Sequence, residues 1–160
     1  MADYEAAIAC APEFAEPYIF RGSHRLAIGD AAGAVADFDR LIEMGVHLAP
    51  AYNGRAGTRV RLLQDYDGAI ADATEAIRLR PRDYHLPWLY RGEARLAKGD
   101  AAGAIEDFTR SRDIVPELGE KRRLLVPRGR AKAAMGDVEG ARADFKEAGP
   151  AGEAFLRELK

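Results

Sequence analysis

The sequence predicts an all-α fold, an α-solenoid built from stacked helix–turn–helix repeats, and two observations carry this prediction. The stretch RGSHRLAIGDAAGAVADF, which starts at Arg21, returns as RGEARLAKGDAAGAIEDF from Arg91, with thirteen of eighteen positions identical. Within each copy, apolar residues recur at intervals of three and four, the spacing of one helix face. A fixed period of this kind indicates stacked units that are each too small to bury an apolar face alone.

The repeat extends along the whole chain. Gly22, Gly57 and Gly92 are 35 residues apart, and Gly129 follows after 37. Between the two helices of each repeat, a glycine or glutamine able to end the first helix precedes an aspartate able to cap the second. These turns are Gly29-Asp30, Gln64-Asp65, Gly99-Asp100 and Gly136-Asp137.

The elements follow in order from this register. A half-repeat is expected at 2–12, a single domain of about four repeats at 15–48, 50–83, 85–118 and 122–149, and a capping helix at 151–159. Pro81 and Pro116 are expected to close the second and third repeats. Pro127 falls inside the first helix of the fourth repeat, where it should kink that helix or make it start late.

Small and charged residues recur at fixed positions and indicate how the helices pack. The glycines of the first helices are expected to face alanines of the second helices, Gly92 facing Ala104. Recurrent arginines and aspartates predict ion pairs between packed helices; the other interpretation is a row of carboxylates for metal. The arginines are Arg21, Arg91 and Arg128, and the aspartates are Asp37, Asp72, Asp107 and Asp144. No function follows from the glycines in the first turn of each second helix, Gly33, Gly68, Gly103 and Gly140.

Composition excludes several function classes. The chain is 48% hydrophobic and 31% charged with a net charge of −2, the balance of a soluble globular protein with no electrostatic reason to bind nucleic acid or membrane. One cysteine in the chain allows no intramolecular disulfide, and the first residues, MADYEAAIAC, do not resemble a signal peptide. A cytoplasmic location is therefore expected.

The sequence also lacks the motifs of known catalytic and cofactor sites. The GDAAGA segments have neither the lysine nor the hydroxyl residue of a phosphate-binding loop, and the three histidines fit no short metal-ligand spacing. We therefore expect no cofactor, no metal site and no enzymatic activity.

The repeats resemble the tetratricopeptide repeat, in arrays of the bacterial type. The residues that carry this resemblance in the third repeat are Trp88, Gly92, Ala104, Phe108 and Pro116. The resemblance implies a right-handed superhelix whose first helices line a concave groove for a partner peptide. The function expected from it is a non-catalytic protein–protein interaction scaffold.

The register assigns residues to this groove. Phe20 and Tyr90 occupy equivalent positions and are candidate aromatic anchors. The stretch from Lys121 to Lys132 holds six basic residues, either a solvated helix face or a patch that binds an acidic peptide. The full set of groove candidates is Phe20, Arg55, Arg61, Leu89, Tyr90, Arg123 and Arg130.

Three other functions remain open at this stage. The chain could associate with itself through the half-repeat at 2–12, or serve as the regulatory arm of a larger protein. A helical period of about 35 residues is also found in RNA-binding pentatricopeptide repeats, although the net charge of −2 argues against an RNA partner.

Overall fold

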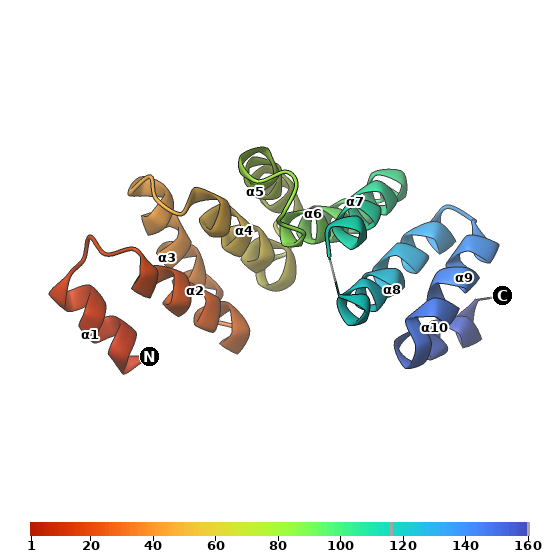
Figure 1. Ribbon diagram of the computed structural model, residues 1–160, viewed down its shortest axis with the longest axis horizontal. Helices are drawn as coiled ribbons and strands as arrows, with labels where there is room; N and C mark the ends of the chain where they lie inside the picture. Colours follow the sequence, from red (N-terminus) through yellow and green to blue (C-terminus); the bar gives the residue numbers. More distant parts are fainter. Residues whose placement is uncertain (116, 160) are drawn as a thin grey trace. The chain divides into compact units, whose positions relative to one another are not determined.

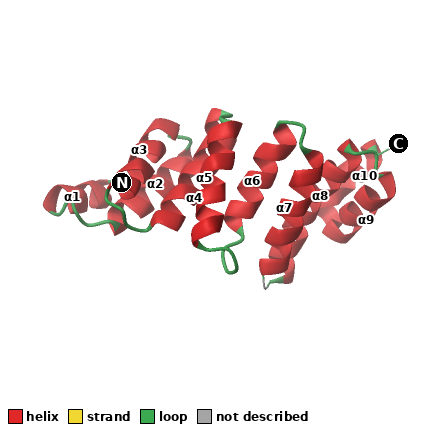
Figure 2. Cartoon of the chain, turned by 90° about the horizontal axis from the view of Figure 1, so that it is seen from above, coloured by secondary structure: helices red, strands yellow, loops and turns green. Residues whose placement is uncertain are grey.

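The computed structural model describes residues 1–115 and 117–159, which form helices joined by short connections and contain no strand (Figure 2). The prediction of an all-α fold built from helical repeats is confirmed. Contacts divide the chain into two compact units, Met1–Pro81 and Arg82–Lys160. Pro116, expected to close the third repeat, lies outside the described residues.

The first unit holds a single helix followed by two helical hairpins (Figure 1). Its core gathers apolar side chains from the first hairpin together with Ala51 of the second, and Ile8 of the first helix packs against it. The elements are α1 (Ala2–Cys10), α2 (Glu16–Ile28), α3 (Ala31–Glu43), α4 (Leu48–Thr58), the π-helical segment η1 (Arg59–Leu63) and α5 (Tyr66–Leu79).

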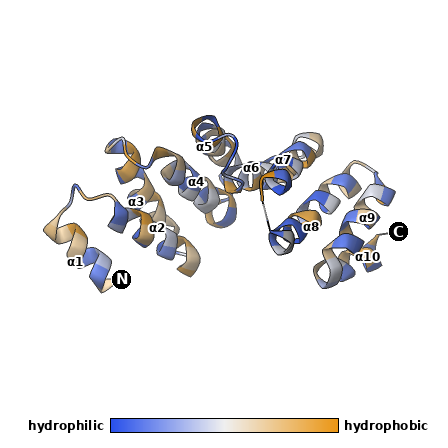
Figure 3. Ribbon diagram, in the orientation of Figure 1, coloured by the Kyte–Doolittle hydropathy of each residue, from blue (hydrophilic) through white to orange (hydrophobic). Residues whose placement is uncertain are grey.

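The second unit holds two hairpins and a short final helix. Phe108 and Ala104 of its first hairpin pack with Ala131 of its second hairpin. The elements are α6 (Leu86–Ala97), α7 (Ala101–Ile114), α8 (Leu118–Ala134), α9 (Val138–Ala148), the 3-10 segment η2 (Gly149–Gly152) and α10 (Glu153–Glu158). Figure 3 shows hydrophilic and hydrophobic segments on the same helices, and no described helix is long and apolar enough to span a membrane.

The turns are built as the sequence predicts. Asp30, Asp65, Asp100 and Asp137 each cap a second helix, and each side chain accepts a hydrogen bond from the backbone N–H three residues later. This cap explains the glycine found at that third position. A Cβ placed on Gly33 would lie 2.2 Å from a carboxylate oxygen of Asp30, so a side chain there would displace the cap.

The glycines of the first helices do not mainly face the alanines, as the sequence suggested, but the aromatic rings of the second helices. A Cβ on Gly92 would lie 2.7 Å from Phe108, and one on Gly129 would lie 2.6 Å from Phe145. Phe38 packs in the same way between Gly22 of α2 and Gly54 of α4. The missing side chain therefore makes room for a buried ring.

The second repeat departs from this register by one residue. The arginine and the buried aspartate that pair within a repeat are 16 residues apart in the other repeats, but Arg55 and Asp72 are 17 apart. The π-helical segment η1 accommodates this extra residue. Consequently Ala56, not Gly57, follows the paired arginine; independently of the offset, Ala73 stands where the second helices of the other repeats have phenylalanine.

Of the two outcomes expected for Pro127, a kink or a late start of its helix, the late start does not occur. Helix α8 begins at Leu118 and continues past Pro127 to Ala134. After α9 ends at Ala148, η2 and α10 return the chain to the last hairpin. There Phe155 stacks on Phe145, with ring centroids 5.3 Å apart.

Gly92→Ala should lower the free energy of unfolding by about 1–3 kcal/mol, because the new methyl group overpacks against Phe108. Gly119→Ala is the matched control, since Gly119 is exposed on α8 with no atom within 4 Å of its Cβ position. Gly119 lies in the first turn of α8, and replacing glycine by alanine there restricts the unfolded chain, so this control should be neutral or stabilising by up to about 1 kcal/mol. Urea denaturation of both variants measures the difference, and equal stabilities would contradict the assigned glycine–ring contact.

Candidate binding site

The most regular feature of the interior is a buried aspartate held by two cations in every repeat. In the first repeat, Asp37 accepts hydrogen bonds from Arg21 at 2.6 Å and from Arg25 at 2.8 Å. The carboxylate is 2% exposed, and both arginines lie on α2, one turn apart. The corresponding sets are Asp72 with Arg55 and Arg59, Asp107 with Arg91 and Arg95, and Asp144 with Arg128 and Lys132.

The second cation of each set also ties the network to the turn. Arg25 donates to the carbonyl oxygen of Gly33 at 3.2 Å and lies 3.4 Å from the cap residue Asp30. Arg59 and Arg95 repeat both contacts, and Lys132 donates to the carbonyl oxygen of Gly140. One cluster therefore fixes first helix, turn and second helix together.

The predicted arginine–aspartate pairs are confirmed, and the recurrent aspartates are accounted for by packing. Hydrogen bonds to their aspartates raise the pKa of Arg21, Arg55 and Arg128, although burial opposes this. No group of three or more potential metal-binding side chains occurs in the described part of the chain.

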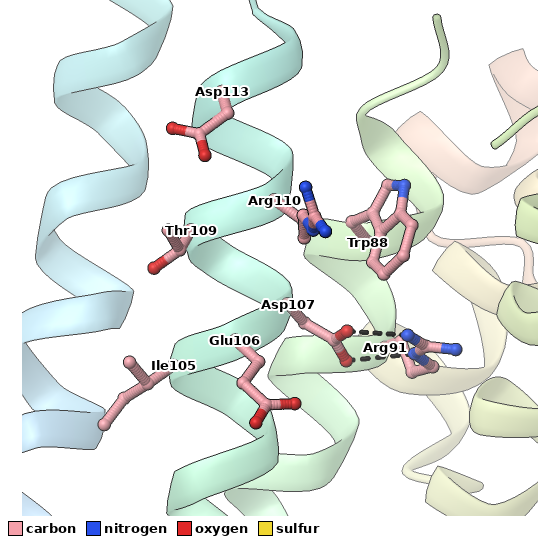
Figure 4. A pocket seen from close by; sticks show the side chains of 8 residues that line it. All are labelled: Trp88, Arg91, Ile105, Glu106, Asp107, Thr109, Arg110 and Asp113. Atoms are coloured by element: carbon pink, nitrogen blue, oxygen red, sulfur yellow. Dashed lines mark hydrogen bonds and ion pairs between the residues drawn. The ribbon is translucent and has the colours of Figure 1, made fainter. Parts of the chain in front are cut away.

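An aromatic ring lies against the first arginine of the network in the first three repeats. The guanidinium of Arg91 lies 4.9 Å from the ring centre of Trp88, and Tyr18 and Tyr52 occupy the same place beside Arg21 and Arg55. A pocket of about 470 Å³ opens beside Trp88 between α6 and α7. Figure 4 shows Asp107 and Arg91 facing each other there, so part of the pocket wall belongs to the packing network.

Arg55, expected in the groove, lies within this network. Its side chain is 17% exposed and pairs with Asp72 of α5 and with Asp39 of α3, which links the two hairpins of the first unit. The one-residue offset of the second repeat explains the difference, because it moves Arg55 to the position of Arg21 and Arg91.

The other aromatic and aliphatic candidates fall into two environments. Tyr90 is buried, and Leu89 packs beside the cluster of Ala104, Phe108 and Ala131. Phe20 is 56% exposed and stacks on Tyr4 of α1 at 6.3 Å between ring centroids. The sequence could not distinguish Phe20 from Tyr90, because their exposure depends on what packs against each helix. Arg61 is exposed on η1.

The basic cluster at 121–132 separates into two groups. Arg128 and Lys132 hold Asp144 and are structural. Arg123 and Arg130 are exposed, and no carboxylate of a described residue lies within ion-pair distance of either. They lie seven residues apart on α8, with the half-buried Val126 between them, and so share one helix face. We refer to Arg123, Val126 and Arg130 as the basic face of α8.

Pro127 adds a backbone group to this region. Because proline has no N–H, it cannot donate to the carbonyl oxygen of Arg123, four residues earlier in α8. The carbonyl of Arg123 therefore lacks its normal helical partner on the turn that carries the basic face.

A pocket of about 350 Å³ adjoins the C-terminal end of the basic face. It is lined by residues of α8, α9, α10 and the residue that follows: Arg130, Ala133, Phe145, Phe155, Glu158 and Leu159. The guanidinium of Arg130 lies 6.0 Å from the ring centre of Phe155. The sequence predicted a capping helix at 151–159 but did not predict this pocket.

The comparisons with known proteins show the fold. No protein-family model and no curated protein matches the sequence. The structure of MamA is 21% identical, with a TM-score of 0.77 over 97% of this chain and 87% of MamA. A tetratricopeptide repeat protein from Thermus thermophilus is 17% identical, with a TM-score of 0.75 over 96% of this chain and 83% of its own. YrrB, a tetratricopeptide repeat protein with an unusual peptide-binding site, is 20% identical, with a TM-score of 0.73 over 91% of this chain and 72% of its own.

Arg55→Ala should lower the free energy of unfolding by about 3 kcal/mol, the lower end of the cost of breaking a buried pair, because Asp72 keeps its bond to Arg59. Arg123→Ala and Arg130→Ala should each change it by less than about 0.5 kcal/mol, as surface substitutions do. Chemical denaturation of the three variants checks this order. An Arg55→Ala protein as stable as the other two would remove Arg55 from the packing network.

The network should also make stability depend on acid pH. Burial alone would raise the pKa of Asp144, but hydrogen bonds from Arg128 and Lys132 outweigh it and the pKa lies below its ordinary value. The unfolded chain therefore takes up the proton first. The stabilisation from Asp144 is complete above about pH 4 and is lost as the pH falls towards the folded-state pKa.

Urea denaturation at a series of pH values measures this effect. We expect Asp144→Asn to be less stable at pH 7 and to show a weaker loss of stability between about pH 4 and pH 2 than the parent protein. Asp113→Asn is the control, because Asp113 is 53% exposed and its pair with Arg112 lies at the surface, so its loss should change stability at pH 7 far less than the loss of Asp144. The same slope for Asp144→Asn and the parent protein would contradict the assignment.

Proposed function

We propose that this chain, which has the fold of the tetratricopeptide repeat proteins, is a non-catalytic scaffold that binds an acidic, partly apolar segment of a partner protein. The binding surface we propose is the basic face of α8 together with the neighbouring side of α6. One observation carries the proposal: Arg123 and Arg130 are exposed without a carboxylate partner among the described residues, whereas the arginines at the recurrent interior positions are held by aspartates.

The surroundings of these two arginines fit a peptide better than a free ion. Helix α6 contacts α8, and Leu89 of α6 packs against the core cluster that includes Ala131 of α8. Half-buried apolar side chains, Val126 among them, therefore border the two charges. Charges at the rim orient a bound segment and speed its association, while apolar contacts between them contribute affinity.

The distribution of polar groups supports a non-catalytic role. The recurrent aspartates, which would be the first candidates for acid–base chemistry or metal binding, are hydrogen-bonded to cations between packed helices. The peptide-binding site of YrrB is a precedent for ligand binding on this fold.

Residues of the first unit are further candidates for partner binding. In the first unit, taken by itself, the exposed Phe20 of α2 and Arg61 of η1 are candidate contacts for a partner. Leu89 and Tyr90 support the surface by packing, whereas Arg55 belongs to the packing network of the first unit. We place the protein in the cytoplasm, as its composition suggests, and in a bacterium, because its repeats resemble arrays of the bacterial type.

A peptide library tests the proposal. We would select ligands from random peptides of about twelve residues displayed with free carboxyl termini, and measure their affinities by fluorescence anisotropy at low and high salt. Selected peptides should be rich in aspartate and glutamate and bind more weakly at high salt. The double variant Arg123→Ala/Arg130→Ala should weaken binding by about tenfold or more, because both charges face the ligand.

The matched control is Arg110→Ala/Arg142→Ala, which removes two arginines from the second helices of the same unit. It should leave the affinities unchanged. Equal weakening by both double variants would move the binding surface away from α8. A solution mass that rises with concentration, with no selected peptide, would favour self-association instead.

A further inference from the structure

Helix α10 covers a place that, in the first repeat, holds the first helix of the next hairpin. The buried ring of Phe38 lies against Gly54 of α4. The equivalent ring of the fourth repeat, Phe145, stacks instead on Phe155 of α10, with ring centroids 5.3 Å apart. With α10 in place, Phe145 is 1% exposed. This side of Phe145 is therefore shaped to receive a helix.

The attachment of α10 rests on a few side chains. The helix has six residues and none of them is buried. Isolated helices shorter than about 12 residues are marginal in water, so α10 depends on its docking against the hairpin. Gly152, directly before α10, is buried against the backbone of Phe145. Release of α10 therefore leaves η2 as an anchor and the last hairpin intact.

The docked side of α10 has the chemistry of the segment that we propose as ligand. Phe155 and Glu158 are three positions apart in α10, and both line the pocket of about 350 Å³ together with Leu159 and Arg130. The guanidinium of Arg130 lies 6.0 Å from the ring centre of Phe155, but no ion pair joins Arg130 and Glu158. An aromatic, an acidic and an aliphatic side chain thus already occupy the end of the basic face of α8, and they leave the charge of Arg130 unpaired.

We propose that α10 is a displaceable occupant of the binding surface, and that the partner takes its place with an amphipathic helical segment of the same chemistry. An aromatic side chain of that segment stacks on Phe145, and an acidic side chain three positions later pairs with Arg130. This inference rests on the proposed function and deepens it, because it specifies both the kind of segment that binds and the regulation of the surface. The segment is internal to the partner chain, and no chain end takes part in its recognition.

The partner segment has two advantages over α10. A carboxylate that reaches Arg130 gains charged hydrogen bonds that Glu158 does not make. Arg123 and Arg130 are seven residues apart, about 10 Å along the axis of α8. A longer helix lying along α8 meets both arginines with acidic residues about seven positions apart.

The docked α10 makes the surface selective. The apparent affinity for a partner is lowered by the fraction of molecules in which α10 is released. A segment that offers only negative charge cannot replace the ring of Phe155 on Phe145. Only a segment with the aromatic and the acidic residue in the right spacing compensates for the release of α10.

The probe for this proposal is the heptapeptide of residues 153–159, N-acetyl-Glu-Ala-Phe-Leu-Arg-Glu-Leu-amide, blocked at both ends so that no terminal charge contributes. Fluorescence anisotropy measures its affinity for the full chain and its variants. Phe155→Ala weakens the docking of α10 but keeps Phe145 and Arg130. This variant should bind the peptide at least about tenfold more tightly than the parent protein, because α10 no longer has to be released.

Three further variants keep the test independent of folding. Glu158→Gln removes the charge beside Arg130 with little change in packing and should strengthen peptide binding by about threefold. Glu153→Gln is its matched control, since Glu153 carries the same charge on α10 but does not line the pocket; it should leave the affinity unchanged. Phe155→Leu keeps part of the apolar contact and should fall between the parent protein and Phe155→Ala. Circular dichroism checks the fold of each variant.

NMR of the parent protein tests the displacement directly. When the peptide saturates the protein, the amide signals of Leu156 and Leu159 should move to the positions of an unstructured chain, while Phe145 stays in a packed environment. Signals of α10 that keep their folded positions in the saturated protein would overturn the displacement. Equal affinities of the parent protein and Phe155→Ala would overturn it as well.

The remaining outcomes separate this proposal from the broader one. Library peptides that are lost in Arg123→Ala/Arg130→Ala, but bind the parent protein and Phe155→Ala equally, would support the scaffold and reject the role of α10. Heptapeptide binding that is unchanged in Arg130→Gln would reject the assigned ion pair. A parent protein whose mass doubles with concentration, beside a Phe155→Ala variant that stays monomeric, would show that α10 exchanges between two copies of this chain instead.

Discussion

The architecture depends on a buried carboxylate shared by two cations in each repeat. Asp37, Asp72, Asp107 and Asp144 are each at most 3% exposed. A buried pair of this kind adds little net stability compared with apolar packing, but removing one partner costs about 3–5 kcal/mol. Here the buried ion pair fixes the register in which the two helices of each hairpin pack. Four hairpins of similar sequence could pair their helices in several ways, and only one alignment brings each aspartate to two cations.

The second repeat shows which constraint is stronger. An extra residue lies between Arg55 and Asp72, and two adjustments were open to the chain. The ion network could lose its geometry, or the helix backbone could absorb the residue. The structure keeps both bonds of Asp72 and places a π-helical segment after Thr58. A single π-turn distorts a few backbone hydrogen bonds, whereas an unpaired buried carboxylate loses its charged hydrogen bonds altogether.

The same comparison explains what the sequence could and could not predict. The caps, the turns and the arginine–aspartate pairs follow from short-range chemistry and were predicted correctly. Gly57 happens to lie 35 residues from both Gly22 and Gly92, although it is not their structural equivalent. This coincidence concealed the one-residue offset, which brings Arg55 into its pair with Asp72. The burial of Tyr90 and the pocket beside Phe155 depend on how whole helices pack, which one repeat does not encode.

Side chains that take no part in the arginine–aspartate network are the ones available for binding a partner. In the fourth repeat, Arg128 and Lys132 face inward to Asp144, and Arg123 and Arg130 face outward from the same helix. Pro127 lies between them and would be costly in a helix that served packing alone, by about 3 kcal/mol relative to alanine. Near it lie Arg123 and Arg130, which have no carboxylate partner among the described residues, so an interrupted helical hydrogen bond, two positive charges and an apolar pocket occur on one part of one helix. That concentration, absent from the strict repeats before it, is why the candidate binding surface belongs to the fourth repeat.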